Sequence, residues 1–504
     1  MTTDPARLRD SVALGFGAAA RLAVLLCVAC GGSSGTTGTV QDQGMPADAS
    51  SGDQGVPDGG AADEGVMDAG ADMDPCVPAD EVCNGLDDSC SGIADDGLDC
   101  AVGPGTGADG DATVDTPLDL STDPRAGGTT GWAVRYAVTA LSGAQVTVGE
   151  AALGLAPGDE VLLINLRGDP DDDARVGTFE TGYVDGVEGG TVTLRAPVVD
   201  VYGRGGSNAD LTGQSVMLQR VPQFDTLTVG GGGVLTTAGF DGATGGVLFV
   251  RARVLEVAAG GRVDVRVRGY RGTTVASNGR MGLTGESVSG QPVRTDGLSP
   301  ESNAGAGQGG TSDCDVFNCT TQTIGAGGGG ASFATEGVAS TDNGALHAGG
   351  AAGAVYGDAA LDRLFLGSGG GGGSGGVGGP GTQTPGGGGA GIGALFAASL
   401  DVAGAVEATG QQGVFNDNCG RQGSGGGGGG SGGTVWLAAD TLRVGAGAVL
   451  ATGGAERCNG GGAGGDGRVR FDAGTLNGED VGSPAAVAAA NAASEPDPGA
   501  LNAR

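Results

Sequence analysis

Short apolar strands alternate with glycine runs between about Asp225 and Asp472, and several of these blocks repeat one another. DTLTVGGGGVLTTAG from Asp225 and DTLRVGAGAVLATGG from Asp440 agree at ten of fifteen positions. LDVAGAVEATG from Leu400 and LEVAAGGRVDVRVRG from Leu255 follow the same order of strand, glycine turn and strand. Each block has one apolar face that needs a stacked neighbour, which is the property of a solenoid. The sequence therefore predicts an all-β chain with glycine-rich β-solenoid-like repeats over residues 224–475.

The longest glycine runs, Gly367–Gly376 and Gly423–Gly433, do not suit ordinary strands, because interior glycine weakens a strand. One interpretation is polyglycine-II packing, with three residues per turn and close chain contacts because no side chain intervenes. The alternative is flexible loops, which the backbone entropy of glycine favours. We expect ordered packing, because the runs adjoin apolar strands. A Ser/Thr/Asn/Gly insertion over 273–343 is expected to loop out of the repeats.

Residues 130–223 are expected to form a small β-sandwich or barrel. Short apolar stretches follow one another between Gly, Pro and Asp, and in Trp132–Val138 apolar and other residues alternate. The pattern PGDEVLLINLRG, GTFETGYV, TVTLRAPVVDVY and LQRVPQF resembles a domain that precedes glycine-rich repeats in bacterial surface proteins associated with adventurous gliding motility. We expect the acidic group at 169–173 to be a solvated loop tip. Residues 102–129 are expected to be an unpatterned linker, and residues 476–504 a disordered tail.

The composition excludes several function classes. All 25 basic residues are arginine, which removes Schiff-base chemistry, a lysine general base and a P-loop. The net charge is −34, so nucleic acid and anionic membrane surfaces should repel the chain, while its carboxylates suit a bridging divalent cation. The one histidine, His347, has too few partners for a catalytic triad or a zinc site. We therefore predict that the chain is not an enzyme.

The first 30 residues have the features of an export signal. Arginines precede the apolar run Leu22–Ala29, and Cys30 follows it. The sequence CVAC resembles the lipobox of bacterial lipoproteins, in which the cysteine carries the lipid, and ordinary secretion with cleavage nearby is the alternative. The resemblance implies a protein at the outer membrane or cell surface, anchored by Cys30. Residues 31–74 are acidic and poor in apolar groups, so we expect a disordered tether there.

The segment PCVPADEVCNGLDDSCSGIADDGLDC, within residues 75–101, carries the most specific motif of the chain. It resembles the metal-binding motifs of MopE-like surface proteins. The alternation of Asp87, Ser89 and Ser91 before Gly92 is typical of the opening of an extracellular calcium loop. Candidate calcium ligands are Asp87, Ser89, Ser91, Asp95 and Asp96. Copper is poorly supported because the motif has no histidine or methionine; a disulfide-held acidic turn without metal is the alternative.

Eight further cysteines are an even number, which in an exported chain favours disulfides. They form three local groups: Cys76, Cys83, Cys90 and Cys100; Cys314 and Cys319; Cys419 and Cys458. Three connectivities are possible in the first group. We favour Cys83 to Cys90 nested inside Cys76 to Cys100.

Taken together, these features predict a non-enzymatic surface protein with a structural or adhesive role. Its expected partners are cell-surface polymers or other envelope proteins, with weak calcium binding at the Cys/Asp motif and membrane contact only through the N-terminal lipid. Metal sequestration is one alternative.

A carbohydrate-active β-helix enzyme is the alternative from another class. Polysaccharide lyases with this fold use arginine bases and calcium-held aspartates. Alternating arginines are more simply the solvated face of a strand, and GESVS from Gly285 lacks the second glycine of a nucleophile elbow. The residues that would serve a lyase are Arg251, Arg253, Arg266, Arg268, Arg271 and Asp264.

Overall fold

The computed structural model describes Pro78, Cys90 and residues 103–125, 127–273, 282–290, 305–311, 325–342, 348–358, 360–375, 384–413, 425–456 and 460–487. For residues 479–487 it describes the backbone alone. The chain divides into two compact units, residues 1–72 and residues 73–504, and every described residue belongs to the second.

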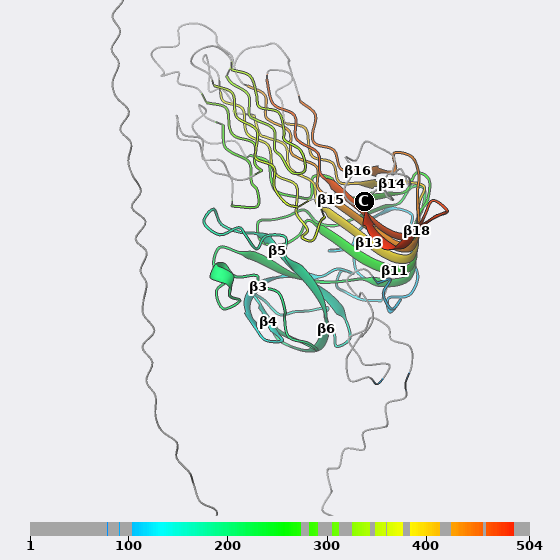
Figure 1. Cartoon of the computed structure of the whole chain (residues 1–504). Coiled ribbons are helices and arrows are strands. Elements are labelled where there is room, and N and C mark those ends of the chain that lie inside the picture. The colour runs from blue at the N-terminus through cyan, green and yellow to red at the C-terminus, as the bar shows by residue number, and fades with distance from the viewer. Residues whose placement is uncertain are drawn as a thin grey trace, which may run out of the picture. The chain divides into compact units, whose positions relative to one another are not determined.

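Two stacked parallel sheets form a β-helix-like body, so the all-β and solenoid-like predictions are confirmed (Figure 1). Each rung consists of one strand in the larger sheet, a tight turn, and one strand in the smaller sheet. The larger sheet has the order β1 (Ala112–Val114), β9 (Gln223–Val229), β11 (Val247–Val257), β13 (Ile392–Val402), β15 (Thr434–Val444), β17 (Arg468–Leu476) and β18 (Glu479–Val487). The smaller sheet has the order β16 (Val449–Leu450), β14 (Ala405–Glu407), β12 (Arg262–Asp264), β10 (Val234–Thr236) and β2 (Pro117–Asp119).

The four sequence repeats are successive neighbours in this stack. Leu227 pairs with Leu255, which pairs with Leu400, which in turn pairs with Leu442. All four leucines are buried in one core that lies between the two sheets. Because each repeat contributes the same apolar positions to this core, sequence similarity between distant blocks translates directly into lateral pairing.

Both ends of the stack contain strands that the sequence patterns missed. The segment expected to be an unpatterned linker contains β1 and β2, which form a first rung against β9 and β10. The segment expected to be a disordered tail begins with β18, which pairs antiparallel to β17. These strands have few apolar residues of their own, so pairing with an existing edge outweighs their weak local preference.

Residues 135–220 form a closed antiparallel barrel of the described strands, in the order β3 (Arg135–Ser142), β4 (Gln145–Val148), β7 (Thr191–Leu194), β6 (Phe179–Glu188), β5 (Glu160–Arg167) and β8 (Ser215–Arg220). A short 3₁₀ helix, η1 (Arg204–Gly206), lies between β7 and β8. The barrel has its own apolar core, which includes Val146, Val184 and Leu218.

A separate apolar layer joins the barrel to the outer side of the larger sheet. Leu162 and Ile164 of β5 belong to the same buried cluster as Phe249, Phe396 and Trp436. This explains why the first halves of β11, β13 and β15 are buried throughout, whereas their second halves alternate between buried and partly exposed positions.

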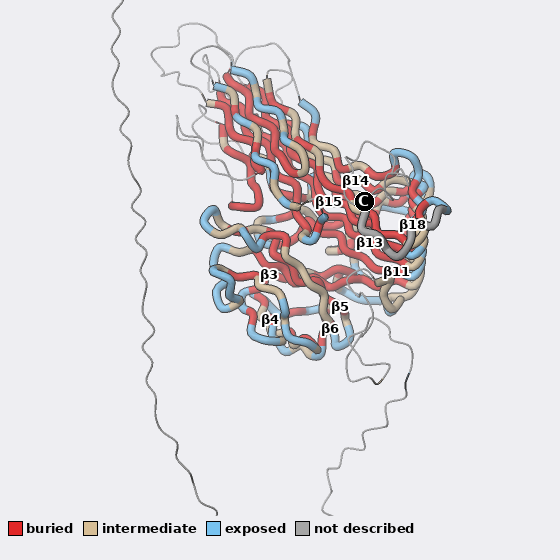
Figure 2. The backbone as a smooth tube through the Cα atoms, viewed as in Figure 1, coloured by how far each residue is buried: buried red, intermediate tan, exposed pale blue. Residues whose placement is uncertain are grey.

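The described parts of the glycine runs are buried and hydrogen-bonded, so they are packed segments and not flexible loops (Figure 2). Their hydrogen bonds repeat every three residues, because backbone donors three positions apart reach the same neighbouring segment. Gly369 and Gly372 donate to Glu286 and Leu283, Gly370 and Gly373 to Gly387 and Thr384, and Gly371 and Ser374 to Gly329 and Ala326. A second run has the same period: Gly425 and Gly428 donate to Ser374 and Gly371, Gly429 and Gly432 to Gly462 and Gly465, and Gly430 and Gly433 to Gln411 and Ala408.

Most of these packed positions have no room for a side chain. A Cβ on Gly371 would lie 1.9 Å from the carbonyl oxygen of Gln308, and one on Gly428 would lie 1.9 Å from that of Gly329. The obstacle in each case is backbone of an adjacent segment, which cannot rotate away. We use "glycine lattice" for these hydrogen-bonded segments: 269–273, 282–286, 305–311, 325–331, 350–353, 367–374, 384–391, 408–413, 425–433, 451–454 and 460–467.

Two expectations about the repeats are wrong. The described parts of the insertion at 273–343 do not loop out, because residues 305–310 and 325–332 are buried inside the glycine lattice. The strand expected through Val267 ends at Asp264, and Val267 is 40% exposed instead of sharing the buried face of Val263 and Val265. Glycine packing in the first case, and a turn in the second, override the local pattern.

Candidate functional site

The residues predicted to bind calcium, Asp87, Ser89, Ser91, Asp95 and Asp96, lie outside the described residues, as do Cys30 and seven of the eight cysteines expected in disulfides. Cys90 is described, and it is disulfide-bonded. Within the described part of the chain, no group of three or more His, Cys, Asp or Glu side chains could hold a metal ion. The calcium site therefore stays a prediction from sequence.

A buried ion pair joins the barrel to the β-helix. The Nε of Arg251 on β11 lies 2.9 Å from Glu160 on β5, and both side chains are 1% exposed. Arg251 also lies over the rings of Phe249 and Phe396, and Gln223 donates to Glu160 at 2.7 Å. The expectation that Arg251 belongs to a solvated face is wrong, because its side chain points into the junction between the two bodies.

Arg220 forms a second pairing at this junction. Its guanidinium bonds to Asp109 at 2.8 Å and to Asp159 at 2.7 Å. Burial by itself lowers the pKa of Arg220, but the two carboxylates outweigh burial and raise it. A guanidinium held in this way has a structural role and is not available as a base.

Two other arginines proposed for a lyase site, Arg253 and Arg266, are held in separate ion pairs. Arg266 lies between Asp264 at 2.6 Å and Glu407 at 3.1 Å, and the exposed Arg253 pairs with Asp225. Burial tends to raise the pKa of Asp264, but hydrogen bonds from Arg266 and its positive charge outweigh burial and lower it. Arg253 lies on β11 and Arg266 follows the end of β12, so these charges belong to separate segments.

The acidic group at 169–173, expected to be a solvated loop tip, forms a loop whose carboxylates are hydrogen-bonded. The Asp169 carboxylate accepts the backbone N–H groups of Asp171 and Asp172 and pairs with Arg204 at 2.7 Å. The Asp172 carboxylate accepts the N–H of Gly205. The carboxylate oxygens of Asp169 and Asp172 therefore stabilise the turns of this loop.

The GESVS segment places a carboxylate, and not a nucleophile, at a central position. The Glu286 side chain is fully buried and bonds to Arg167 at 2.6 Å and to Arg271 at 2.8 Å. Ser287 is buried, and its backbone bonds to Gly290. Because one carboxylate lies between two guanidiniums, this group of three keeps a net positive charge in a strongly acidic chain.

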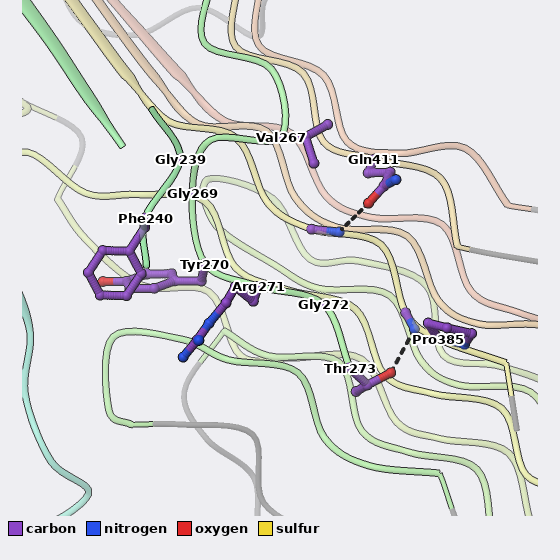
Figure 3. Close-up of a pocket in the computed structure, with 12 residues that line it drawn as sticks. Gly239, Phe240, Val267, Gly269, Tyr270, Arg271, Gly272, Thr273, Pro385 and Gln411 are labelled. Carbon is purple, nitrogen blue, oxygen red and sulfur yellow. Dashed lines mark hydrogen bonds between the residues drawn. The ribbon is translucent and has the colours of Figure 1, made fainter. Parts of the chain in front are cut away.

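A pocket of about 320 Å³ opens beside this group, where the glycine lattice meets the turn after β12 (Figure 3). Its wall includes Arg271, whose side chain is 45% exposed. The Gln411 amide oxygen accepts the N–H of Gly388 at 3.1 Å, and the Thr273 hydroxyl accepts that of Gly386 at 2.7 Å. At the opposite side the buried ring of Phe240 meets that of Tyr270 edge-on. We name this cavity the Arg271 pocket; its further lining residues are Gly239, Val267, Gly269, Gly272 and Pro385.

Two backbone features distinguish the Arg271 pocket from the rest of the lattice. Val267 has φ of 55°, a left-handed conformation that is an outlier for a β-branched residue. A Cβ on Gly388 would lie 3.1 Å from Val267 Cγ1 and 3.7 Å from both Gln411 Oε1 and the Tyr270 carbonyl oxygen, so its one tight contact is with a side chain. The lattice packing that forbids a side chain at Gly371 or Gly428 therefore does not do so at Gly388.

Sequence reasoning missed both the junction pair and the pocket. A signal for the pair was present, because Glu160 and Arg251 are charged residues in the otherwise largely apolar stretches DEVLLINL and VLFVRARV. A charge inside a strand that is buried on both faces needs an opposite partner. No signal of this kind marked Val267, Gly388 or Gln411, which come together from separate rungs.

Comparisons with known proteins add little to this geometry. No family model and no curated protein matches the chain. Within the described residues, no helix is long and apolar enough to cross a membrane. Among solved structures, the chain is similar to the crystal structure of the Pseudomonas phage phi297 tailspike gp61, with 21% identity over 31% of this chain and 26% of that one, at a TM-score of 0.14. The match spans about a quarter of the tailspike, and we base no functional conclusion on it.

Proposed function

We propose that the chain is a non-enzymatic surface protein of the cell envelope with a structural and adhesive role. The observation that carries the structural part is the three-residue period of hydrogen bonds in the glycine lattice. This period is that of polyglycine-II helices, which have three residues per turn. Buried backbone bonded to three neighbours makes a stiff scaffold.

The adhesive part rests on the acidic surface and on the resemblance to bacterial surface proteins. At a net charge of −34 the chain needs a cation, or a local positive patch, to approach another anionic polymer. Calcium at the Cys/Asp motif would supply such a bridge, and Cys30 would anchor the protein by its lipid.

The decisive experiment compares a deletion strain with a strain complemented by the full gene. We expect loss of surface adhesion or of motility, with normal growth. A deletion strain equal to its parent in adhesion and motility would refute the adhesive role. Complementation with a Cys30→Ser variant tests the anchor, and we expect that protein to leave the membrane fraction.

Calcium binding is tested on a peptide of residues 75–101 with its disulfides formed. Few carboxylate ligands imply weak binding, with a Kd of about 10⁻⁴ to 10⁻³ M. Calorimetry should therefore detect heat with millimolar calcium, and an Asp87→Asn peptide should give less. A flat titration of the native peptide would leave the motif as a disulfide-held turn.

The carbohydrate-active enzyme is the second candidate, and the pairing of Arg266 with Asp264 and Glu407 is its best support. It predicts activity on uronate polymers that Arg266→Ala abolishes. We rank it lower, because the other arginines named for it are held in separate ion pairs or lie apart. Stoichiometric metal in the purified protein would favour metal sequestration instead.

A further inference from the structure

We propose that the Arg271 pocket binds a carboxylate-bearing sugar unit, of the size of a single hexuronate. The inference deepens the proposed adhesive role, because it names a ligand class that the protein could bind directly, without bridging calcium. It rests on the geometry and charge of the pocket and on the strained residue at its rim.

Size and lining suit a small polar ligand. At about 320 Å³ the cavity is at the lower end of the range for small-molecule sites. Pro385, Phe240 and Val267 give apolar surface, while Gln411 presents an exposed amide. A sugar ring has this combination of apolar faces and hydroxyl groups.

Charge favours an acidic ligand. Arg167 and Arg271 share the single carboxylate of Glu286. Arg268 lies between the lining residues Val267 and Gly269 but does not itself line the pocket. Arg271 is therefore the guanidinium that a ligand carboxylate would contact. A ligand carboxylate would meet this surplus of positive charge.

The backbone at the rim supports a binding role. A β-branched residue in the left-handed region is strained, and such strain persists where the surrounding structure or a function requires it. Val267 adopts this conformation while remaining 40% exposed at the pocket, so burial of its side chain does not account for the strain. The place of a Cβ on Gly388 lies 3.1 Å from Val267 Cγ1, so glycine keeps this part of the wall free of a side chain, although lattice packing does not demand glycine there.

The test is a titration of the purified full chain with galacturonate, in which binding is measured by ligand-observed NMR or by calorimetry. Neutral galactose is the comparison sugar. We expect saturable binding of galacturonate at least tenfold tighter than that of galactose. Gly388→Val should weaken galacturonate binding at least tenfold, because its methyl groups would occupy the pocket. The matched control is Gly186→Val on β6, where a Cβ has open space, and this variant should bind as the parent does.

A second pair of variants tests the charge. Arg271→Gln should weaken galacturonate binding severalfold and leave galactose unchanged, whereas Arg443→Gln, on an exposed side chain elsewhere, should change neither. Equal binding of the two sugars, no saturable binding, or Gly388→Val behaving as Gly186→Val would each overturn the proposal. Failure of the pocket and failure of the adhesive role are distinguishable, since the first is measured on purified protein and the second on the deletion strain.

Discussion

Replacing Gly428 by alanine should destabilise the protein strongly, although the change adds a single methyl group. The Cβ would lie 1.9 Å from the carbonyl oxygen of Gly329, and real Cβ atoms keep at least 3.0 Å. The two segments must therefore separate by about 1.1 Å, the difference between these distances. The hydrogen bonds between these two segments run from Gly328 to Gly426 at 2.9 Å and from Ala331 to Gly429 at 2.9 Å, and Gly428 itself donates to Gly371 at 2.8 Å. Separation on this scale would break or severely weaken all three bonds.

The expected loss follows from these contacts. Three hydrogen bonds at about 1 kcal/mol each give about 3 kcal/mol, and overpacking adds roughly 1–3 kcal/mol. Alanine also lowers the conformational entropy of the unfolded chain, which offsets about 0.4–1 kcal/mol of this loss. We therefore expect Gly428→Ala to lower the free energy of unfolding by about 4 kcal/mol.

The assay is urea unfolding of the purified chain, monitored by fluorescence and circular dichroism. The matched control is Gly388→Ala, where the added Cβ meets the movable Val267 side chain, and we expect a change within about 1 kcal/mol. If the two alanine variants lose the same stability, tight backbone packing does not hold the lattice together and the reasoning above is wrong.

Three other predictions concern the Arg251–Glu160 ion pair, Asp264 and the glycine lattice. Arg251→Met should cost about 3–5 kcal/mol in urea unfolding, because it leaves Glu160 buried without its ion-pair partner. Arg443→Gln should cost less than about 1 kcal/mol. Similar losses of stability in the two variants would contradict the assigned burial of Arg251. The pKa of Asp264 is lowered in the folded protein. Its contribution to stability is therefore present above about pH 4 and is lost as the pH falls through the folded pKa. Asp264→Asn should therefore flatten the decline in melting temperature on the acid side. Amide hydrogen exchange should show protection across Gly369–Gly373, and exchange at the rate of an unfolded peptide would exclude a packed lattice.

The repeats were predictable because they carry redundant information. Leu227, Leu255, Leu400 and Leu442 recur at matching places in similar blocks, so the solenoid and the pairing of its rungs followed from comparison of the sequence with itself. The barrel followed from alternating apolar residues between turn signals. In both cases a local pattern agrees with the final packing.

What escaped prediction depends on contacts between distant segments. Strands β1 and β2 have little apolar pattern, and they form because the edges of β9 and β10 are available to them. Glu160 and Arg251 are 91 residues apart, and nothing local selects one as the partner of the other. The Arg271 pocket is assembled from the segment after β10, the turn after β12 and two later lattice segments, and sequence patterns do not predict that these segments meet.

The three-residue period of the glycine lattice also restricts how this region can change length. Adding or removing three residues within a run would leave each later donor aimed at its former neighbour, since partners recur at that interval. Adding or removing one or two residues would turn every later donor towards a different neighbour and bring the few Ser and Ala side chains into positions where only glycine fits. Length variation in the runs should therefore be tolerated in multiples of three, a rule set by backbone geometry.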